Sequence, residues 1–204
     1  YVINTHGHFD HAGGSAYFQK VYGAAIVMTA EDWAIARAEP DLPQFYMAKP
    51  NVDVVAEDAD VIALGDNAFE LFNTPGHTTG VLSIRYKVRE GEREYTAMTL
   101  GGVGLNFSGV ERTETYINSY ERLQSIQEGT SVSLPNHAAM GKVFARRDLL
   151  AIREGGEANP FVNPDSYKKD LSAFLSAAKI KLKQEKSGTA PTAVEALTKA
   201  ITDS

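Results

Sequence analysis

The sequence predicts an α/β protein, and two observations support this class. Short apolar runs that suit β-strands alternate along the chain with amphipathic segments that suit α-helices, and turns rich in glycine or proline separate the two kinds. At 204 residues, of which 43% are hydrophobic and 23% charged, the chain has the composition of a globular protein with one sizeable core. We therefore expect one domain over residues 1–186, followed by a linker and a short C-terminal helix over residues 187–204.

The first part of the chain is predicted to contain two strands, two helices and a long loop. Residues 1–4 suit a buried strand that leads into a histidine-rich segment, and a helix is expected near residues 13–21, with Phe18 and Val21 available for burial. A strand at residues 25–28 precedes a second helix, where Thr29 and Asp32 form a capping-box pattern. Residues 39–53 include three prolines and suit an irregular loop. Because a domain rarely begins at a buried strand, we expect further residues before Tyr1.

The remaining predicted elements are two β-hairpins, three helices and a short strand. Residues 60–64 and 69–73 flank one hairpin turn, and residues 81–88 and 95–100 flank another; both turns combine glycine with polar residues. Helices are expected near residues 113–127, 144–153 and 164–185, and apolar side chains recur at helical spacing in the first and the last of them. A short strand at residues 132–134 leads to the last histidine of the chain.

Composition excludes several classes of site and partner. The chain has no cysteine, so it can form no disulfide, no thiolate nucleophile and no cysteine-ligated metal site. No apolar run approaches the roughly 20 residues of a membrane helix, and a net charge of -6 at pH 7 disfavours nucleic-acid binding. We therefore expect a small-molecule substrate, with neither a membrane nor a nucleic acid as a partner.

Every histidine of the chain can be placed in one metal site, together with one aspartate. The six side chains are His6, His8, Asp10, His11, His77 and His137. The first four lie within six residues, and each of the last two follows a short apolar run and a proline. Imidazole and carboxylate are common nitrogen and oxygen ligands of divalent metals. Six such ligands are enough for two ions with three each, which leaves an open position, as in catalytic rather than structural zinc sites.

Local geometry supports this interpretation. Side chains two residues apart in an extended segment point to the same side, so His6 and His8 can share one ion, and the turn that follows can bring His11 to a second. The alternative is a polar loop with scattered histidines, against which the density of ligands argues. Taken singly, His77 and His137 are weaker candidates, because a lone histidine after a proline is more often a surface or hydrogen-bonded residue.

Residues 5–14 read Thr-His-Gly-His-Phe-Asp-His-Ala-Gly-Gly and resemble the His-x-His-x-Asp-His signature, with its trailing glycines, of the metallo-β-lactamase superfamily. The Pro-Gly-His-Thr sequence around His77 and the segment around His137 resemble the later ligand motifs of that family, in the same order. The resemblance implies a four-layer αββα sandwich, with metal ions at one edge between the two sheets. It also implies that the N-terminal half-sheet of that fold is missing from this sequence and would complete the domain.

The resemblance also implies how the ligands are divided between two Zn²⁺ ions. The expected sets are His6, His8 and His77 for the first ion, and Asp10, His11 and His137 for the second. This division is similar to that of the third subclass of metallo-β-lactamases, because the first two subclasses use a cysteine that this chain lacks. Iron, manganese or cobalt are alternatives to zinc, since the same nitrogen and oxygen ligands accept them.

The chain departs from related enzymes in one segment, residues 99–104, which read Thr-Leu-Gly-Gly-Val-Gly. Glyoxalase II and ribonuclease Z relatives carry a metal-bridging aspartate at the corresponding place, and this segment offers no carboxylate. Many third-subclass enzymes have a serine in the turn that here reads Gly102-Val103-Gly104. We interpret these glycines as a tight turn rather than a phosphate-binding loop, because no lysine, serine or threonine follows at the required spacing.

The function implied by the resemblance is that of a dizinc hydrolase that opens β-lactams by attack of a metal-bound hydroxide on the carbonyl, with Asp10 as the catalytic carboxylate. A lactone or other ester is the alternative substrate, which the missing serine favours, and a metal-binding protein without turnover is a third hypothesis. Phe9, Phe45 and Tyr46 are candidate substrate contacts, with packing over the core as the alternative. A periplasmic location and a role in antibiotic resistance are expected if a signal peptide precedes Tyr1, and a cytoplasmic location otherwise.

Overall fold

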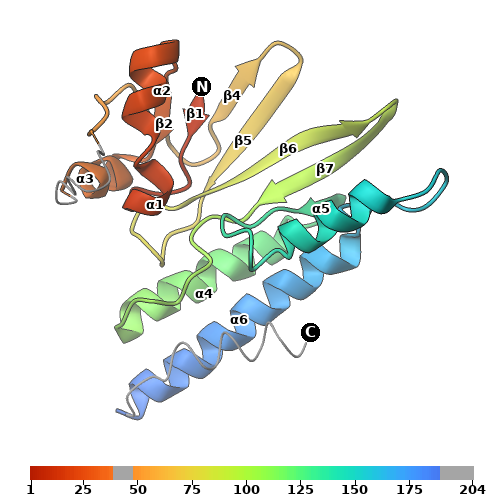
Figure 1. Cartoon of the computed structure of the whole chain (residues 1–204). Helices are drawn as coiled ribbons and strands as arrows, with labels where there is room; N and C mark the ends of the chain where they lie inside the picture. Colours follow the sequence, from red (N-terminus) through yellow and green to blue (C-terminus); the bar gives the residue numbers. More distant parts are fainter. Residues whose placement is uncertain (39–47, 189–204) are drawn as a thin grey trace.

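The computed structural model describes residues 1–38 and 48–188, which form four layers in the order helix, sheet, sheet, helix (Figure 1). The expected α/β class and αββα arrangement are confirmed. Of the predicted linker and terminal helix, Ser187 and Gly188 are described, and the candidate contacts Phe45 and Tyr46 lie outside the described residues. Within the described ranges, no helix combines the length and the apolar character that crossing a membrane requires.

The described residues contain two sheets. The first sheet is parallel and consists of β1 (Val2–Ile3), β2 (Ile26–Met28) and β3 (Val54–Val55), in that order. The second consists of β4 (Val61–Leu64), β5 (Asn67–Asn73), β6 (Leu82–Glu90), β7 (Arg93–Thr99) and β8 (Thr130–Ser133), also in chain order. Strands β4 to β7 are antiparallel neighbours, as the two predicted hairpins require, whereas β8 runs parallel to β7.

Helices cover the outer face of each sheet. On the side of the first sheet lie α1 (Phe9–Ala12), α2 (Ser15–Tyr22) and α3 (Ala30–Ala38). The second sheet is covered by α4 (Val110–Ser125) and α6 (Pro164–Lys186), with α5 (Val143–Ile152) beside α6 (Figure 1). Asn163 caps α6, because its side chain accepts hydrogen bonds from the backbone N–H groups of Asp165 and Ser166.

Apolar cores fill the three spaces between the layers. Strand β2 contributes to two of them, because successive side chains of a strand point to opposite faces. Ile26 and Met28 pack with Trp33 of α3, whereas Val27 packs with Leu71 between the two sheets. The third core joins the second sheet to α4 and α6. Its bulkiest fully buried side chains are Tyr116, Tyr120, Tyr167 and Phe174.

The helix predicted near residues 13–21 is observed as α2, but its predicted burial is wrong. Phe18 and Val21 are 45% and 53% exposed, whereas Ser15 at the start of the helix is buried. The Ser15 hydroxyl accepts a hydrogen bond of 2.9 Å from the side chain of Asn4. A polar contact at one end therefore holds α2 beside the segment that carries the first histidines, and its aromatic side chains remain at the surface.

Candidate metal centre

The predicted ligands lie on segments that follow the ends of strands. His6 follows β1, His77 follows β5 and His137 follows β8. The backbone N–H of Leu82 donates to the carbonyl of Thr5 over 2.8 Å, which joins the segment after β1 to the start of β6. The sheets therefore bring residues that are far apart in the sequence to one edge.

The first cluster consists of His6, His8 and His77. One ring nitrogen of each lies within 4.8 Å of the corresponding nitrogens of the other two. His8 Nδ1 lies 3.1 Å from His77 Nε2, so at most one of these two atoms carries the hydrogen between them. His6 and His77 are buried and His8 is half-buried, so nitrogen lone pairs converge in a place that is largely shielded from water.

The second cluster consists of Asp10, His11 and His137, whose ligand atoms also lie within 4.8 Å of one another. Asp10 Oδ2 is 3.3 Å from His11 Nε2 and 3.9 Å from His137 Nε2. Asp10 is exposed and the two histidines are half-buried, so this cluster lies nearer to solvent than the first. The rings of His6 and His11 are 4.1 Å apart between centroids, which makes the two clusters immediate neighbours.

The donor set fits a divalent metal. Buried side-chain nitrogens normally have hydrogen-bond partners, yet His6 Nε2 and His11 Nε2 are buried without one. The other nitrogen of His6, Nδ1, already lies 3.1 Å from the hydroxyl of Thr5. These two nitrogens, one in each cluster, are of the type that binds divalent metal ions, and a bound ion would take the place of the missing hydrogen bonds. The structure thus places both predicted sets together, and the binding of metal to them stays a prediction.

The backbone carbonyl of Gly104 fixes the ring of His77. His77 Nδ1 lies 2.8 Å from this oxygen, which can only accept, so Nδ1 carries the hydrogen and Nε2 presents its lone pair to the cluster. Gly102 has φ +57°, a backbone conformation that favours glycine, and the tight turn stays a prediction. A Cβ at Gly102 would lie 2.8 Å from His77 Cβ, and one at Gly104 would lie 3.3 Å from His77 Cε1. The glycines therefore let this segment approach the ligand, a role that the sequence pattern did not reveal.

Burial keeps the histidines in the neutral form that binds metals. Loss of hydration, together with the neighbouring imidazoles, lowers the pKa of His6 from 6.5 to about 2. Burial also lowers the pKa of His77 to about 4, although the hydrogen bond to Gly104 acts in the opposite direction. The pKa of His11 is lowered by burial and raised by Asp10, with burial the larger effect. Because metal ligands must be deprotonated, these shifts favour metal binding at neutral pH.

Helix α4 holds the loop that carries His77 through three polar side chains. The guanidinium of Arg112 donates to the carbonyls of Gly76, over 2.7 Å, and of His77. Ser119 donates to the carbonyl of Pro75 over 2.7 Å. The third is Arg122. It follows Ser119 by three residues, and Ser119 follows Arg112 by seven, so all three lie on one face of the helix. Sequence reasoning missed these residues, although their helical spacing was a usable signal.

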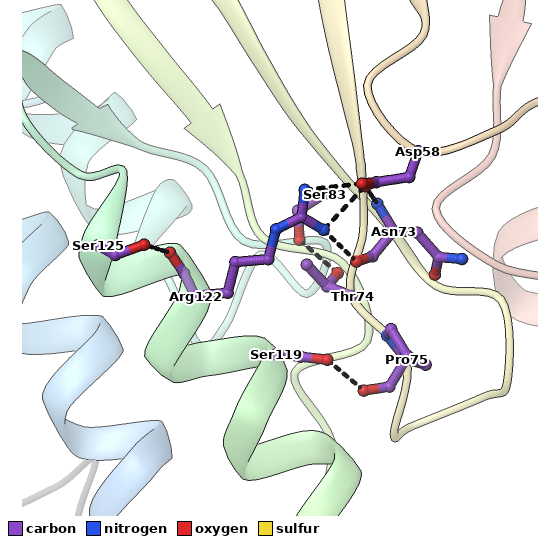
Figure 2. A network of polar contacts seen from close by, with 8 residues as sticks. All are labelled: Asp58, Asn73, Thr74, Pro75, Ser83, Ser119, Arg122 and Ser125. Carbon is purple, nitrogen blue, oxygen red and sulfur yellow. Dashed lines mark hydrogen bonds and ion pairs between the residues drawn. The ribbon is translucent and has the colours of Figure 1, made fainter.

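Arg122 anchors the end of β5 immediately before this loop (Figure 2). Its two terminal nitrogens lie 2.8 Å from the two carboxylate oxygens of Asp58, and one of them also donates to the carbonyl of Asn73 over 3.0 Å. Asp58 in turn accepts from the backbone N–H of Asn73 over 2.8 Å. The guanidinium of Arg122 lowers the pKa of the Asp58 carboxyl. The network therefore fixes both the backbone N–H and the backbone carbonyl of Asn73.

One of the candidate substrate contacts is described. Phe9 begins α1, between His8 and Asp10, and its side chain is 45% exposed. An exposed aromatic ring between members of the two clusters suits a wall of the site, and its contact with substrate stays a prediction.

The chain is similar to one known protein family and to several solved structures. Residues 1–90 match the family model described as the metallo-beta-lactamase superfamily. Native FEZ-1 metallo-beta-lactamase from Legionella gormanii superimposes with a TM-score of 0.78 at 25% identity, covering 90% of this chain and 74% of that one. BJP-1, a subclass B3 metallo-beta-lactamase of Bradyrhizobium japonicum, gives 0.76 at 21% identity, with 91% and 73% covered.

The curated proteins that are similar to this chain in sequence are named differently from these solved structures. A hydroxyacylglutathione hydrolase of Maricaulis maris is 40% identical over 80 residues, which is 39% of this chain and 26% of that protein. Another, of Methylococcus capsulatus, is 24% identical over 193 residues, with 81% and 69% covered. An N-acyl homoserine lactonase of Bacillus sp is 34% identical over 84 residues, with 41% and 31% covered. The chain covers less than half of the length of two of the hydroxyacylglutathione hydrolases that it matches, 26% of one and 46% of the other.

Proposed function

We propose that this chain, whose residues 1–90 match the model of the metallo-β-lactamase superfamily, is a dizinc hydrolase that opens the cyclic amide of β-lactams. The observation that carries this proposal is the pair of adjacent three-ligand clusters, each with one buried nitrogen that makes no hydrogen bond. Two further features support a β-lactam. The solved relatives that share the fold over about 90% of the chain are metallo-beta-lactamases, and residues 99–104 contain no carboxylate of the bridging kind.

The geometry of each cluster supports a division of the six ligands between two ions. The first ion would be held by His6, His8 and His77, and the second by Asp10, His11 and His137. Bound there, divalent ions would supply a lowered pKa for water and polarisation of the substrate carbonyl. Asp10 directs Oδ2 toward the histidines of its own cluster and is exposed on the solvent side. We assign to its other oxygen the role of orienting the attacking water and accepting its proton.

The second candidate substrate is an ester, either a lactone or a thioester. Curated relatives by sequence support it, since they include hydroxyacylglutathione hydrolases and an N-acyl homoserine lactonase. The glycine turn at residues 102–104 supports it as well, because it lacks the serine that many third-subclass lactamases have there. A periplasmic location and a role in antibiotic resistance stay predictions.

Hydrolysis by zinc-reconstituted protein separates these candidates. The substrates are a carbapenem, a cephalosporin, an N-acyl homoserine lactone and an S-hydroxyacyl glutathione, each with and without chelator. Asp10→Asn should abolish turnover, whereas Asp66→Asn, in the exposed β4–β5 turn, serves as a matched control and should leave it unchanged. Chelator-sensitive turnover of the β-lactams supports the first candidate, and preference for the lactone or thioester supports the second. Absence of chelator-sensitive turnover on all four would leave a metal-binding protein without activity.

A further inference from the structure

We propose that Asp32 is a positioning residue for the first metal cluster, holding the two chain segments that carry its three histidines at a fixed separation. This inference rests on the proposed function, because it requires that His6, His8 and His77 bind a metal ion.

The carboxylate of Asp32 bridges the two segments. Asp32 lies in the first turn of α3 and is fully buried. Its Oδ1 accepts a hydrogen bond of 3.1 Å from the backbone N–H of Gly7, the residue between His6 and His8. Its Oδ2 accepts one of 3.0 Å from the hydroxyl of Thr78, the residue after His77. One oxygen is therefore used on each segment.

The sequence pattern suggested a different use for this side chain. In a capping box, the carboxylate of Asp32 would accept from the backbone N–H of Thr29. The structure keeps one half of that motif, since the N–H of Asp32 lies 3.3 Å from the Thr29 hydroxyl. The carboxylate instead points to Gly7 and Thr78, so the capping-box prediction is wrong for its second half.

Both segments also pack directly on the first turn of α3, with glycine at each point of contact. A Cβ added at Gly7 would lie 2.3 Å from the backbone oxygen of Asp32. One added at Gly80 would lie 2.0 Å from the hydroxyl oxygen of Thr29 and 3.0 Å from Asp32 Oδ2. The Thr29 hydroxyl donates to the carbonyl of Gly80 over 2.8 Å. The start of α3 is thus a template against which both ligand segments are fixed.

Burial of the Asp32 carboxylate is energetically unfavourable unless another group compensates its negative charge. Moving a charge out of water costs roughly several kcal/mol unless the charge is paired. Within residues 1–38 and 48–188, the carboxylate of Asp32 accepts hydrogen bonds from Gly7 and Thr78, which are both uncharged. Burial raises the pKa of Asp32, and the hydrogen bonds from Gly7 and Thr78 lower it. A positive charge at His8, in the first cluster, would also lower it. A cation bound at the first cluster would compensate the buried charge, which in turn would favour its binding.

Two substitutions separate the charge from the hydrogen bonds. Asp32→Asn keeps the size of the side chain and one acceptor oxygen but removes the charge. Thr78→Val keeps the charge and removes one of the two hydrogen bonds. Substitution of outer partners of metal ligands commonly weakens metal affinity about 10- to 100-fold, and we expect about 10-fold or more from Asp32→Asn and a smaller loss from Thr78→Val.

The test measures Co²⁺ affinity of the metal-free full chain by competition with a chelator, and follows the absorption bands of the bound ion. It is made in a His137→Ala background, so that the second cluster lacks one of its three ligands. Asp53→Asn is the matched control. Asp53 also accepts a hydrogen bond of 2.9 Å from a backbone N–H, that of Ile26. This contact lies at the start of β2, whereas α3 follows the end of that strand. Thermal unfolding of each metal-free variant establishes that it is folded.

The expected result is weaker Co²⁺ binding and altered absorption bands in Asp32→Asn, with the Asp53→Asn protein within about twofold of its parent. Unchanged affinity in folded Asp32→Asn, beside a parent that binds Co²⁺, would overturn this inference and leave the proposed function standing. If Asp32→Asn does not fold, Thr78→Val decides in the same way. A wild-type chain that binds no Co²⁺ would overturn the proposed function and this inference together.

Discussion

Gly7 is the position where the smallest substitution should have a large and local effect. An alanine Cβ there would lie 2.3 Å from the backbone oxygen of Asp32 and 2.8 Å from the backbone nitrogen of Ala36. Both are backbone atoms of α3, so rotation of a side chain cannot relieve the clash. The segment that carries His6 and His8 must instead move by about 1 Å to restore ordinary van der Waals separation.

The size of the effect follows from this displacement. Overpacking of a tightly packed region costs about 1–3 kcal/mol, so we expect Gly7→Ala to lower the free energy of unfolding by about 2 kcal/mol. For a chain of 204 residues, each kcal/mol corresponds to about 2–4 °C in Tm, which gives a decrease of about 4–8 °C. The displaced histidines should also bind metal at least about 10-fold more weakly, because substitution of residues that hydrogen-bond to metal ligands has an effect of this size.

Gly14→Ala is the matched control in the same part of the chain. The nearest heavy atom to a Cβ at Gly14 is Phe18 Cε2 at 3.9 Å, and Gly14 has φ -83°, so alanine fits without strain. The assays are thermal unfolding of the metal-free proteins and chelator competition for Zn²⁺. A Gly7→Ala protein that matches Gly14→Ala in both Tm and Zn²⁺ affinity would show that the segment does not pack on α3 as described.

Four further outcomes are expected. Asp10→Asn should lose nearly all hydrolytic activity in steady-state assays while its Tm changes by less than about 2 °C, because Asp10 is exposed. In the metal-free protein, burial lowers the pKa of His77 from 6.5 to about 4, so the unfolded chain takes up a proton that the folded chain does not; urea titrations should therefore show stability falling from pH 6.5 to pH 4, by about 3 kcal/mol at most from this residue. Arg122→Met should cost about 1 kcal/mol of stability in the same titrations, since its ion pair is partly exposed. Gly102→Ser should weaken Zn²⁺ binding in chelator competition rather than confer new activity, because its Cβ would meet His77 and its φ is +57°.

The sequence was most informative where function depends on residue type and spacing. The six candidate ligands could be named in advance because histidine is rare and the motif packs four ligands into six residues. Both hairpins were predicted because their turns and alternation are local signals. The structure added that the two sets of three are assembled from strands distant in the sequence.

The residues that hold the ligands in place could not be predicted in the same way. Asp32 looked like part of a helix cap, because its real partners, Gly7 and Thr78, are distant in the sequence. The carbonyl of Gly104 has no side-chain signature at all, since any residue carries a carbonyl and the glycine is needed only for close approach. Burial of Phe18 was predicted from its apolar character, but α2 is fixed by a polar contact instead. Such long-range and backbone contacts are set by tertiary structure.

The number of metal ions per chain tests the dinuclear site most directly. Elemental analysis of the zinc-reconstituted protein, after removal of free metal, should find two ions per chain in the wild type. His77→Ala and His137→Ala should each reduce this number to about one, because each removes one of three ligands from a different cluster. A wild-type chain with fewer than two ions, or a count that neither substitution changes, would contradict the two-cluster assignment.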